Sequence, residues 1–438
     1  MNISVIGLGK LGLCTATCIA SKGHKVVGVD SNQAHIQSLE NRACPIQENR
    51  LEELLEKSFE RMTFTADYAR AIQDTDVTLI IVPTPSGADG AFINDYVLSV
   101  LKEISPALAL KKEFHIVDVV STVMPGSSEK EFIPFLEKAT AKKCGVDFGF
   151  VYNPEFIALG SVIHDFLNPD MVLIGQSDEK SGQVVQKLYE QFVDSSPRFA
   201  VMSLINAEIT KLALNCFVTM KITYANELAR VCGAVNGADV DVVTQALGAD
   251  TRVGGRCLKG GLGFAGPCFP RDNIAFQKLA SDIGANLFLS PNVVKSNDFI
   301  VDNIFKVVTA RVKEGSTLAL LGFAYKPGTH ITERSQSLLL MERFLDARYC
   351  VAAHDPAAKI EVESKYKSKV TICQSAEETV LLSDGALLLT PWPEYLSMDW
   401  ASVFAKLTRH LDFFDCWRAV KEISCDNVTY WGLGSGGR

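Results

Sequence analysis

Cys268 is the residue of this 438-residue sequence whose surroundings most clearly indicate chemistry. Cys268 lies in G-P-C-F-P-R-D at residues 266–272, where Pro270 suits the first turn of a helix. A thiol just before a helix N-terminus is favoured as thiolate by the helix dipole and by free backbone N–H groups. The pattern therefore predicts a nucleophile. The alternative, a small buried hydrophobe, is our interpretation of the other eleven cysteines.

A glycine-rich turn at the start of the chain has the spacing of a dinucleotide-binding loop. G-L-G-K-L-G at residues 7–12 follows an apolar run at 3–6 and precedes a helical pattern. The glycines of such a loop let the backbone approach a pyrophosphate, and an acid about 20 residues further on binds the adenosine ribose. Asp30, followed by Ser and Asn rather than Arg, favours NAD over NADP. The alternative interpretation of the glycine motif is a tight structural turn. The predicted contacts of the cofactor are Gly7, Gly9, Leu11, Gly12 and Asp30.

Hydroxyl groups follow two further expected strands, and a carboxyl group lies further along the chain. Thr84 lies in V-P-T-P at 82–85 and Thr122 in S-T-V-M-P-G at 121–126. Because the carboxyl ends of strands line the ligand crevice of an open α/β sheet, both threonines are placed to bind cofactor or substrate. Glu155, in Y-N-P-E-F, could act as an acid or base. The alternatives are that Thr84 and Thr122 belong to proline-directed turns without a role in binding, and that Glu155 is a solvated side chain.

Lys211 and Asn215 lie four residues apart in a helical pattern and so share one helix face. A half-buried lysine beside an amide could hold a developing alkoxide or a water molecule. Most such pairs belong to a solvated stripe, so this pair becomes informative only if a reactive group faces it.

Composition excludes several classes of protein. Lys plus Arg number 43 and Asp plus Glu 51, a net charge of −8, which argues against general binding to nucleic acid or anionic lipid. There is no C-x-x-C pair and no H-E-x-x-H, so we expect no metal site and reduced thiols in a cytoplasmic protein. No apolar run reaches the roughly 18 residues of a membrane span, and the N-terminal stretch, interrupted by Lys10, lacks the basic start of a signal peptide.

The elements that position these residues alternate between strands and helices, which predicts an α/β fold with parallel sheets. A helical pattern through Ile209, Leu212, Cys216, Met220 and Leu228 interrupts the alternation between about 203 and 295. A second α/β region follows, and the two α/β regions could be distant structural echoes of each other. The expected strands cover residues 3–6, 26–29, 77–82, 114–120, 171–174, 318–321, 350–353, 385–389 and 410–414.

Together these motifs resemble those of the UDP-glucose/GDP-mannose dehydrogenase family, the nucleotide-sugar dehydrogenases. The resemblance runs in order along the whole chain, and the cysteine motif is its most diagnostic part. Its motifs are G-L-G-x-x-G at 7–12, V-P-T-P at 82–85, S-T-V-x-P-G at 121–126, N-P-E-F at 153–156, Lys211 with Asn215, N-E-L at 226–228, G-F-x-G-x-C-F-P-R-D at 263–272, G-F-A-Y-K-P-G-T at 322–329 and H-D-P at 354–356.

The resemblance implies three domains, with the active site between them. We expect an NAD-binding Rossmann domain at residues 1–200, a central helical dimerisation domain at 201–298 and a Rossmann-like nucleotide-sugar (UDP)-binding domain at 299–438. It also implies a homodimer in which Arg252 reaches the partner's active site. No nucleic acid or membrane partner is expected.

The implied reaction is a four-electron oxidation of the C6 alcohol of a UDP- or GDP-linked sugar to a uronic acid, with two NAD and one water. By analogy, Cys268 captures the aldehyde as a thiohemiacetal, which loses a second hydride to become a thioester that water cleaves. Lys211 would stabilise the alkoxide, with Asn215 beside it. Asp272, Thr122 and Glu155 would position or activate water and relay protons.

The resemblance also assigns ligand contacts residue by residue. For the cofactor it adds Thr84, Thr122 and Arg334. For the substrate it points to the loop 259–264 and to residues around it: Glu155, Phe156, Lys211, Asn215, Arg252, Gly260, Phe264, Gly266 and Lys326.

Two departures from the family pattern affect this transfer. Leu159 stands where many members have a second glutamate, which leaves water handling to Glu155 and Asp272. Glu333 stands at the usual position of a cofactor-binding arginine, and Arg334 follows one residue later. Neither departure affects Cys268.

Two other functions are compatible with parts of the sequence. A two-electron dehydrogenase of the β-hydroxyacid type shares the Rossmann domain and the long helix, but it needs neither a nucleophilic cysteine nor a second α/β domain. A non-catalytic protein that binds NAD or a nucleotide sugar would release no NADH. The sequence does not identify the sugar: UDP-glucose, a UDP-N-acetylhexosamine and GDP-mannose fit similar motifs.

Overall fold

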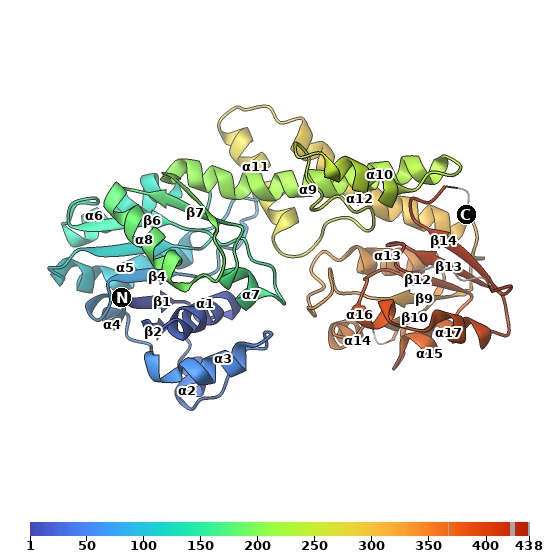
Figure 1. The fold of residues 1–438 in the computed structure, drawn as a ribbon, viewed down its shortest axis with the longest axis horizontal. Coiled ribbons are helices and arrows are strands. Elements are labelled where there is room, and N and C mark those ends of the chain that lie inside the picture. The colour runs from blue at the N-terminus through green and yellow to red at the C-terminus, as the bar shows by residue number, and fades with distance from the viewer. Residues whose placement is uncertain (367, 421–424, 437–438) are drawn as a thin grey trace. The chain divides into compact units, whose positions relative to one another are not determined.

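The computed structural model describes residues 1–366, 368–420 and 425–436, which form helices and strands in two compact units (Figure 1). The units cover residues 1–213 and 214–438. The boundary falls inside one long helix, α9 (Leu204–Ala234), of 31 residues. Among the described residues no helix is both long and apolar enough to span a bilayer.

An eight-stranded sheet forms the centre of the first unit. Its order is β3-β2-β1-β4-β5-β6-β7-β8, and all neighbours are parallel except β6 and β7. The order reverses between β1 and β4, and the crevice at such a switch point is where open α/β sheets bind ligands. The strands are β1 (Asn2–Ile6), β2 (Lys25–Val29), β3 (Met62–Thr65), β4 (Val77–Ile80), β5 (His115–Val119), β6 (Phe148–Tyr152), β7 (Met171–Gln176) and β8 (Arg198–Ser203).

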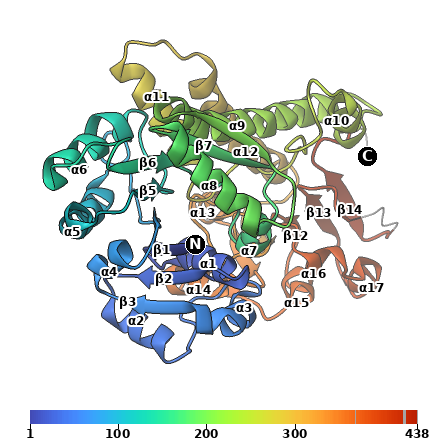
Figure 2. The ribbon, with the colours of Figure 1, turned by 60° about the vertical axis from the view of Figure 1, so that its left-hand side comes forward.

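Helices cover both faces of this sheet and bury separate apolar clusters. Figure 2 shows α8 on one side of the sheet and α5 and α6 on the other. The first face is covered by α1 (Lys10–Ser21), α2 (Gln33–Glu40), α3 (Leu51–Ser58), α7 (Val162–Leu167) and α8 (Glu179–Phe192). The second is covered by α4 (Tyr68–Gln73), α5 (Asp95–Leu110), the π-helical segment η2 (Ser128–Phe132) and α6 (Ile133–Thr140); a 3-10 turn, η1 (Phe59–Arg61), precedes β3.

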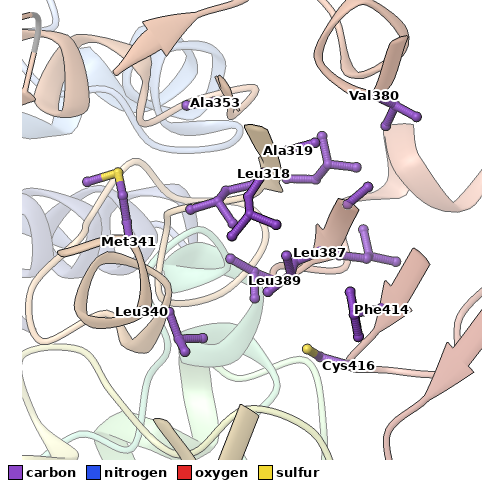
Figure 3. Packing of buried hydrophobic residues seen from close by; sticks show 14 of the residues in the cluster. Leu318, Ala319, Leu340, Met341, Ala353, Val380, Leu387, Leu389, Phe414 and Cys416 are labelled. Atoms are coloured by element: carbon purple, nitrogen blue, oxygen red, sulfur yellow. The ribbon is translucent and has the colours of Figure 1, made fainter. Parts of the chain in front are cut away.

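The second unit begins with helices and continues into a six-stranded parallel sheet of order β11-β10-β9-β12-β13-β14. Its helices are α10 (Val240–Ala249), α11 (Phe269–Asp282), α12 (Leu289–Thr309), α13 (Gln336–Asp346), α14 (Lys359–Tyr366), α15 (Ala376–Leu381), α16 (Pro393–Leu396) and α17 (Trp400–Ala405). Its strands are β9 (Thr317–Leu321), β10 (Cys350–His354), β11 (Thr371–Ile372), β12 (Gly385–Leu388), β13 (Leu411–Asp415) and β14 (Val428–Gly432). Figure 3 shows Leu340 and Met341 of α13 in one cluster with Leu318 of β9 and Leu387 of β12.

The two sheets share one local arrangement of residues. A glycine with positive φ follows the first strand of each, Gly7 (93°) and Gly322 (98°). An aspartate after the second strand then accepts backbone N–H groups from the turn: Asp30 from Leu8, at 2.8 Å, and Asp355 from Ala324, at 3.0 Å. The expected echo between the two α/β regions is therefore present.

The predicted α/β class is confirmed, and each expected strand has a counterpart. Strands β3, β6, β8, β11 and β14 were not predicted, because they are short, contain glycine or polar residues, or are only partly buried. The helical character of residues 203–295 is also confirmed, since α9, α10 and α11 fill most of it. The three-domain boundaries at 200 and 298 stay a prediction.

Candidate active site

The glycine-rich turn after β1 is built to hold a ligand against the start of α1. Packing explains two of its glycines: a Cβ on Gly7 would lie 2.2 Å from the carbonyl oxygen of Ile81, and one on Gly12 1.8 Å from that of Gly7. Gly9 is different, because a Cβ there would meet no described atom within 4 Å. The open space at Gly9 lies at the N-terminus of α1, where free backbone N–H groups favour a phosphate. The turn therefore fits the pyrophosphate of a dinucleotide.

Asp30 is fixed at the carboxyl end of β2. Its Oδ2 accepts the N–H of Leu8 and its Oδ1 that of Asn32, both at 2.8 Å. His35 holds the other side of the turn, since its Nε2 lies 2.9 Å from the carbonyl oxygen of Leu8. These bonds set the carboxylate beside the turn, at the position where a Rossmann fold binds ribose.

The loops after β4 and β5 are joined to each other. The hydroxyl of Thr84 donates to the carbonyl oxygen of Thr122 at 2.6 Å, and the hydroxyl of Ser121 donates to that of Val82 at 2.7 Å. Thr84 and Thr122, both predicted to bind ligand, are thus in direct contact at the switch-point edge of the sheet. One role of Thr84 is to hold that edge together.

Glu155 lies in a polar cluster of the first unit with Tyr189 and Lys211. The hydroxyl of Tyr189 donates to Glu155 Oε1 at 2.7 Å. Burial raises the pKa of the Glu155 carboxyl to about 7, while the hydrogen bond from Tyr189 and the charge of Lys211 oppose that rise. Lys211 Nζ donates to the Glu155 carbonyl oxygen and lies 4.4 Å from the ring centre of Phe156. Such a carboxyl is suited to exchanging protons near neutral pH.

Glu208 connects α9 to the loop that carries Thr122. It is fully buried, and its carboxylate accepts the backbone N–H groups of Gly126 and Ser128. Lys211 lies three residues further along the same helix. Glu208 therefore positions the Thr122 loop relative to the helix that carries Lys211.

Cys268 occupies the N-cap position of α11 and is exposed, as its predicted place before a helix requires. One turn into α11 lies Asp272, which is 1% exposed and donates its backbone N–H to the carbonyl oxygen of Cys268 at 2.8 Å. Asn215 Nδ2 donates to Asp272 Oδ2 at 2.6 Å. The second unit thus joins two predicted residues, Asn215 and Asp272, by a hydrogen bond and places Cys268 one helical turn before Asp272.

Tyr325 is a further neighbour of this cysteine turn. A Cβ on Gly266, whose φ is +84°, would lie 2.7 Å from the tyrosine ring. Burial raises the pKa of Tyr325 to about 12, with a smaller contribution from the charge of Cys268. Only glycine at 266 lets the cysteine turn pack this closely against the ring.

A cavity of about 190 Å³ lies beside Tyr325 within the second unit. The loop that leads to the cysteine is held next to it: Phe264 N–H donates to Asn297 Oδ1 at 2.8 Å, and the Gly260 carbonyl accepts from Arg418 at 2.8 Å. The cavity combines aromatic and apolar walls with cationic and amide groups, as a nucleotide site does. Among its lining residues are Gly263, Tyr325, Lys326, Gln336, Thr390 and Trp417.

Arg252 and Arg334 do not join these clusters by any hydrogen bond of the described residues. The Arg252 side chain is 87% exposed and pairs with Asp250 at 2.6 Å. Arg334 has a φ of +51° and belongs to the second unit, whereas the dinucleotide loop belongs to the first. Their predicted roles stay predictions.

Sequence reasoning missed Tyr189 and Glu208. Glu208 had a signal, because it lies three residues before Lys211 and so on a similar helix face. The sequence gives no sign of the role of Tyr189, because this residue occupies an apolar position of the amphipathic helix α8, 34 residues from Glu155.

Comparison with known families gives matches along nearly the whole chain. Three domains of the UDP-glucose/GDP-mannose dehydrogenase family match in order: the NAD binding domain at residues 1–193, the central domain at 205–299 and the UDP binding domain at 319–422.

Individual relatives agree in class but differ in the sugar they are named for. The chain is 33% identical to the UDP-glucose 6-dehydrogenase AglM of Haloferax volcanii over 91% of its length and 93% of that protein's. It is 34% identical to the GDP-mannose 6-dehydrogenase of Pseudomonas syringae pv. tomato over 89% and 90%. Among solved structures, a UDP-glucose dehydrogenase from Pyrobaculum islandicum superimposes with a TM-score of 0.88 at 29% identity, covering 99% of this chain and 98% of that one.

Proposed function

Because this chain belongs to the UDP-glucose/GDP-mannose dehydrogenase family and is an NAD-dependent nucleotide-sugar dehydrogenase, we propose that it oxidises the C6 alcohol of a UDP-hexose fully to the uronate. The observation that carries this proposal is the position of Cys268 at the N-cap of α11, one helical turn before the buried Asp272 to which Asn215 donates. A two-electron oxidation needs no such nucleophile.

The proposed sequence has two oxidations and one hydrolysis. The C6 alcohol loses a hydride and a proton to become an aldehyde, and the Cys268 thiolate adds to its carbonyl carbon to form a thiohemiacetal. Loss of a second hydride gives a thioester, which water cleaves to the carboxylate and the free thiol. NAD supplies the hydride acceptor for both oxidations, so the overall change consumes one sugar, two NAD⁺ and one water and yields two NADH and three protons.

The helix end beneath Cys268 supports its nucleophilic role. The positive end of the α11 dipole favours a thiolate at the N-cap. Asp272 lies one turn into α11, and Asn215 of α9 donates a hydrogen bond to its carboxylate. From this position we assign Asp272 to proton transfer at the thioester stage and Asn215 to the support of the alkoxide.

Lys211 and Glu155 carry the remaining proton and charge chemistry in this proposal. Lys211, one turn before Asn215 on α9, stabilises the alkoxide of the thiohemiacetal with its ammonium group. Glu155, whose pKa of about 7 lets it both accept and release a proton near neutrality, takes a proton from the attacking water. Because Leu159 stands where the family pattern has a second glutamate, no glutamate at 159 is available to activate water in place of Glu155.

UDP-glucose is our first choice of substrate, with UDP-N-acetylhexosamines and GDP-mannose as alternatives. The match to a UDP binding domain over residues 319–422 supports a uridine nucleotide. The cavity beside Lys326 supports binding of the sugar nucleotide in this unit, with Lys326 as the cationic contact of sugar or phosphate.

A homodimer formed through α9 is part of the proposal. Three large apolar side chains on α9 are exposed at intervals of seven residues: Phe217 by 58%, Tyr224 by 50% and Val231 by 60%. Residues seven apart lie on one helix face, and a row of this kind is typical of an interface. The exposed Arg252 would then serve the partner's active site.

Replacing Cys268 by serine tests the function most simply. We expect Cys268→Ser to lose uronate formation while NAD binding, measured by titration, stays within about twofold of wild type, because the cofactor loop lies in the other unit. Cys257→Ser is the matched control, since Cys257 is also an exposed cysteine of this unit. A Cys268→Ser enzyme with wild-type turnover would refute the mechanism.

A further inference from the structure

Lys10 is a residue of the dinucleotide loop to which no role has yet been assigned. It is the fourth residue of G-L-G-K-L-G and the first of α1. Its ammonium nitrogen lies 3.3 Å from Glu48 Oε2, and its side chain is 25% exposed. A lysine thus begins the helix whose N-terminus faces the open space at Gly9.

Glu48 is held in place by more than Lys10. Its side chain is 1% exposed, and its two oxygens accept the N–H groups of Gly160, at 3.2 Å, in the turn before α7, and of Val162, at 3.4 Å, the first residue of α7. The carboxylate is therefore fixed between two loops and the start of α1. Lys10 can reorient more readily than Glu48, since its side chain is more exposed and its ammonium lies at the end of a flexible four-carbon stem.

The start of α1 combines three features that suit an anionic ligand. Gly9 leaves space there, the first turn contains no acidic residue, and the first N–H groups of the helix are directed toward that space. A diphosphate at this place would lie within reach of the Lys10 side chain, because the residue adjoins Gly9. Two anions, the diphosphate and the Glu48 carboxylate, would then compete for one ammonium group.

We propose that Lys10 is a ligand of the NAD diphosphate and that Glu48 competes for it, which sets the affinity for the cofactor. Without cofactor Lys10 pairs with Glu48; with cofactor its ammonium turns to the diphosphate. This role is additional to the backbone and ribose contacts of the loop and does not depend on which sugar is oxidised or on the chemistry of Cys268.

The test is the binding of ADP-ribose and of adenosine to the full-length protein by calorimetry. ADP-ribose carries the diphosphate and adenosine does not. We expect Lys10→Met to weaken ADP-ribose binding about tenfold, the effect of losing one charge-assisted hydrogen bond, and to leave adenosine binding unchanged. Lys10→Arg should restore most of the affinity, and Glu48→Gln should bind ADP-ribose more tightly than wild type because the competing charge is gone.

Lys22→Met is the matched control, because Lys22 lies just after the other end of α1 and pairs with the exposed Asp194. It should change neither affinity. The proposal is overturned if Lys10→Met binds ADP-ribose as wild type does, or if it weakens adenosine equally, since the lysine would then act on the fold of the loop. Unchanged or weaker ADP-ribose binding by Glu48→Gln would overturn the competition.

Discussion

Burial raises the pKa of Glu155, and Tyr189 opposes that rise. Its hydroxyl donates to the carboxyl at 2.7 Å and so stabilises the ionised form, which opposes the effect of burial. The balance leaves the pKa of Glu155 at about 7. If Glu155 accepts a proton from water, the enzyme must lose activity as the pH falls through this value, because the protonated carboxyl has no capacity left to accept one.

We therefore predict that Tyr189→Phe moves the acidic limb of the pH profile of kcat/KM to higher pH. The substitution removes the hydrogen bond that favours the ionised carboxylate, so the pKa of Glu155 rises and the active form appears only at higher pH. Tyr349→Phe, which loses a hydrogen bond to the Val312 carbonyl in the second unit, is the control and should leave the limb in place. A limb that stays, or moves to lower pH, would show that Glu155 is not the titrating base.

At the scale of elements, the glycines of the turn between β1 and α1 divide into those that folding requires and one that cofactor binding requires. Gly7 and Gly12 are glycines because a Cβ would collide with backbone oxygens, whereas Gly9 has no such restriction from the protein. The same three residues thus fulfil two roles: two close the strand–helix turn, and one leaves room for the cofactor.

Two alanine substitutions test this division. Gly9→Ala should keep the free energy of unfolding within about 1 kcal/mol of wild type but abolish measurable NAD binding, since the new methyl group occupies the space at the helix start. Gly12→Ala should lower the free energy of unfolding by roughly 3 kcal/mol, because its Cβ would lie 1.8 Å from the Gly7 oxygen. Urea titrations and NAD titrations measure the two effects. Normal NAD binding by Gly9→Ala would mean that the pyrophosphate lies elsewhere.

Sequence alone predicted the parts of the site that depend on local structure. The N-cap position of Cys268 and the fixed Asp30 follow from proline, glycine and strand patterns within short segments. Tyr189 escaped prediction because its bond to Glu155 joins distant segments, and an apolar helix position gives no sign of such a role. Strand β8 escaped because its residues, from Arg198 on, are exposed or only partly buried and so lack a hydrophobic run.

At the scale of the whole molecule, the proposed homodimer makes each active site depend on two chains if Arg252 acts on its partner. We predict that Arg252→Ala and Cys268→Ser are each inactive, yet regain about a quarter of wild-type activity when unfolded together and refolded in equal amounts. Half of the random dimers would be mixed, and each mixed dimer would contain one complete site.

Activity in this mixing experiment is measured as NADH release. Adding Phe217→Glu to both chains should prevent recovery, because a charge in the apolar row on α9 opposes pairing. If Arg252→Ala and Cys268→Ser recover no activity when they are refolded together without Phe217→Glu, Arg252 does not act in the partner's active site.

The ratio of NADH formed to sugar consumed tests the central claim most directly. The purified protein is given NAD and, one at a time, UDP-glucose, UDP-galactose, the UDP-N-acetylhexosamines and GDP-mannose. Oxidation through a Cys268 thioester predicts two NADH per sugar and a uronate product with one member of the panel. One NADH per sugar with an aldehyde product, or no NADH with any of them, would contradict a four-electron oxidation at Cys268.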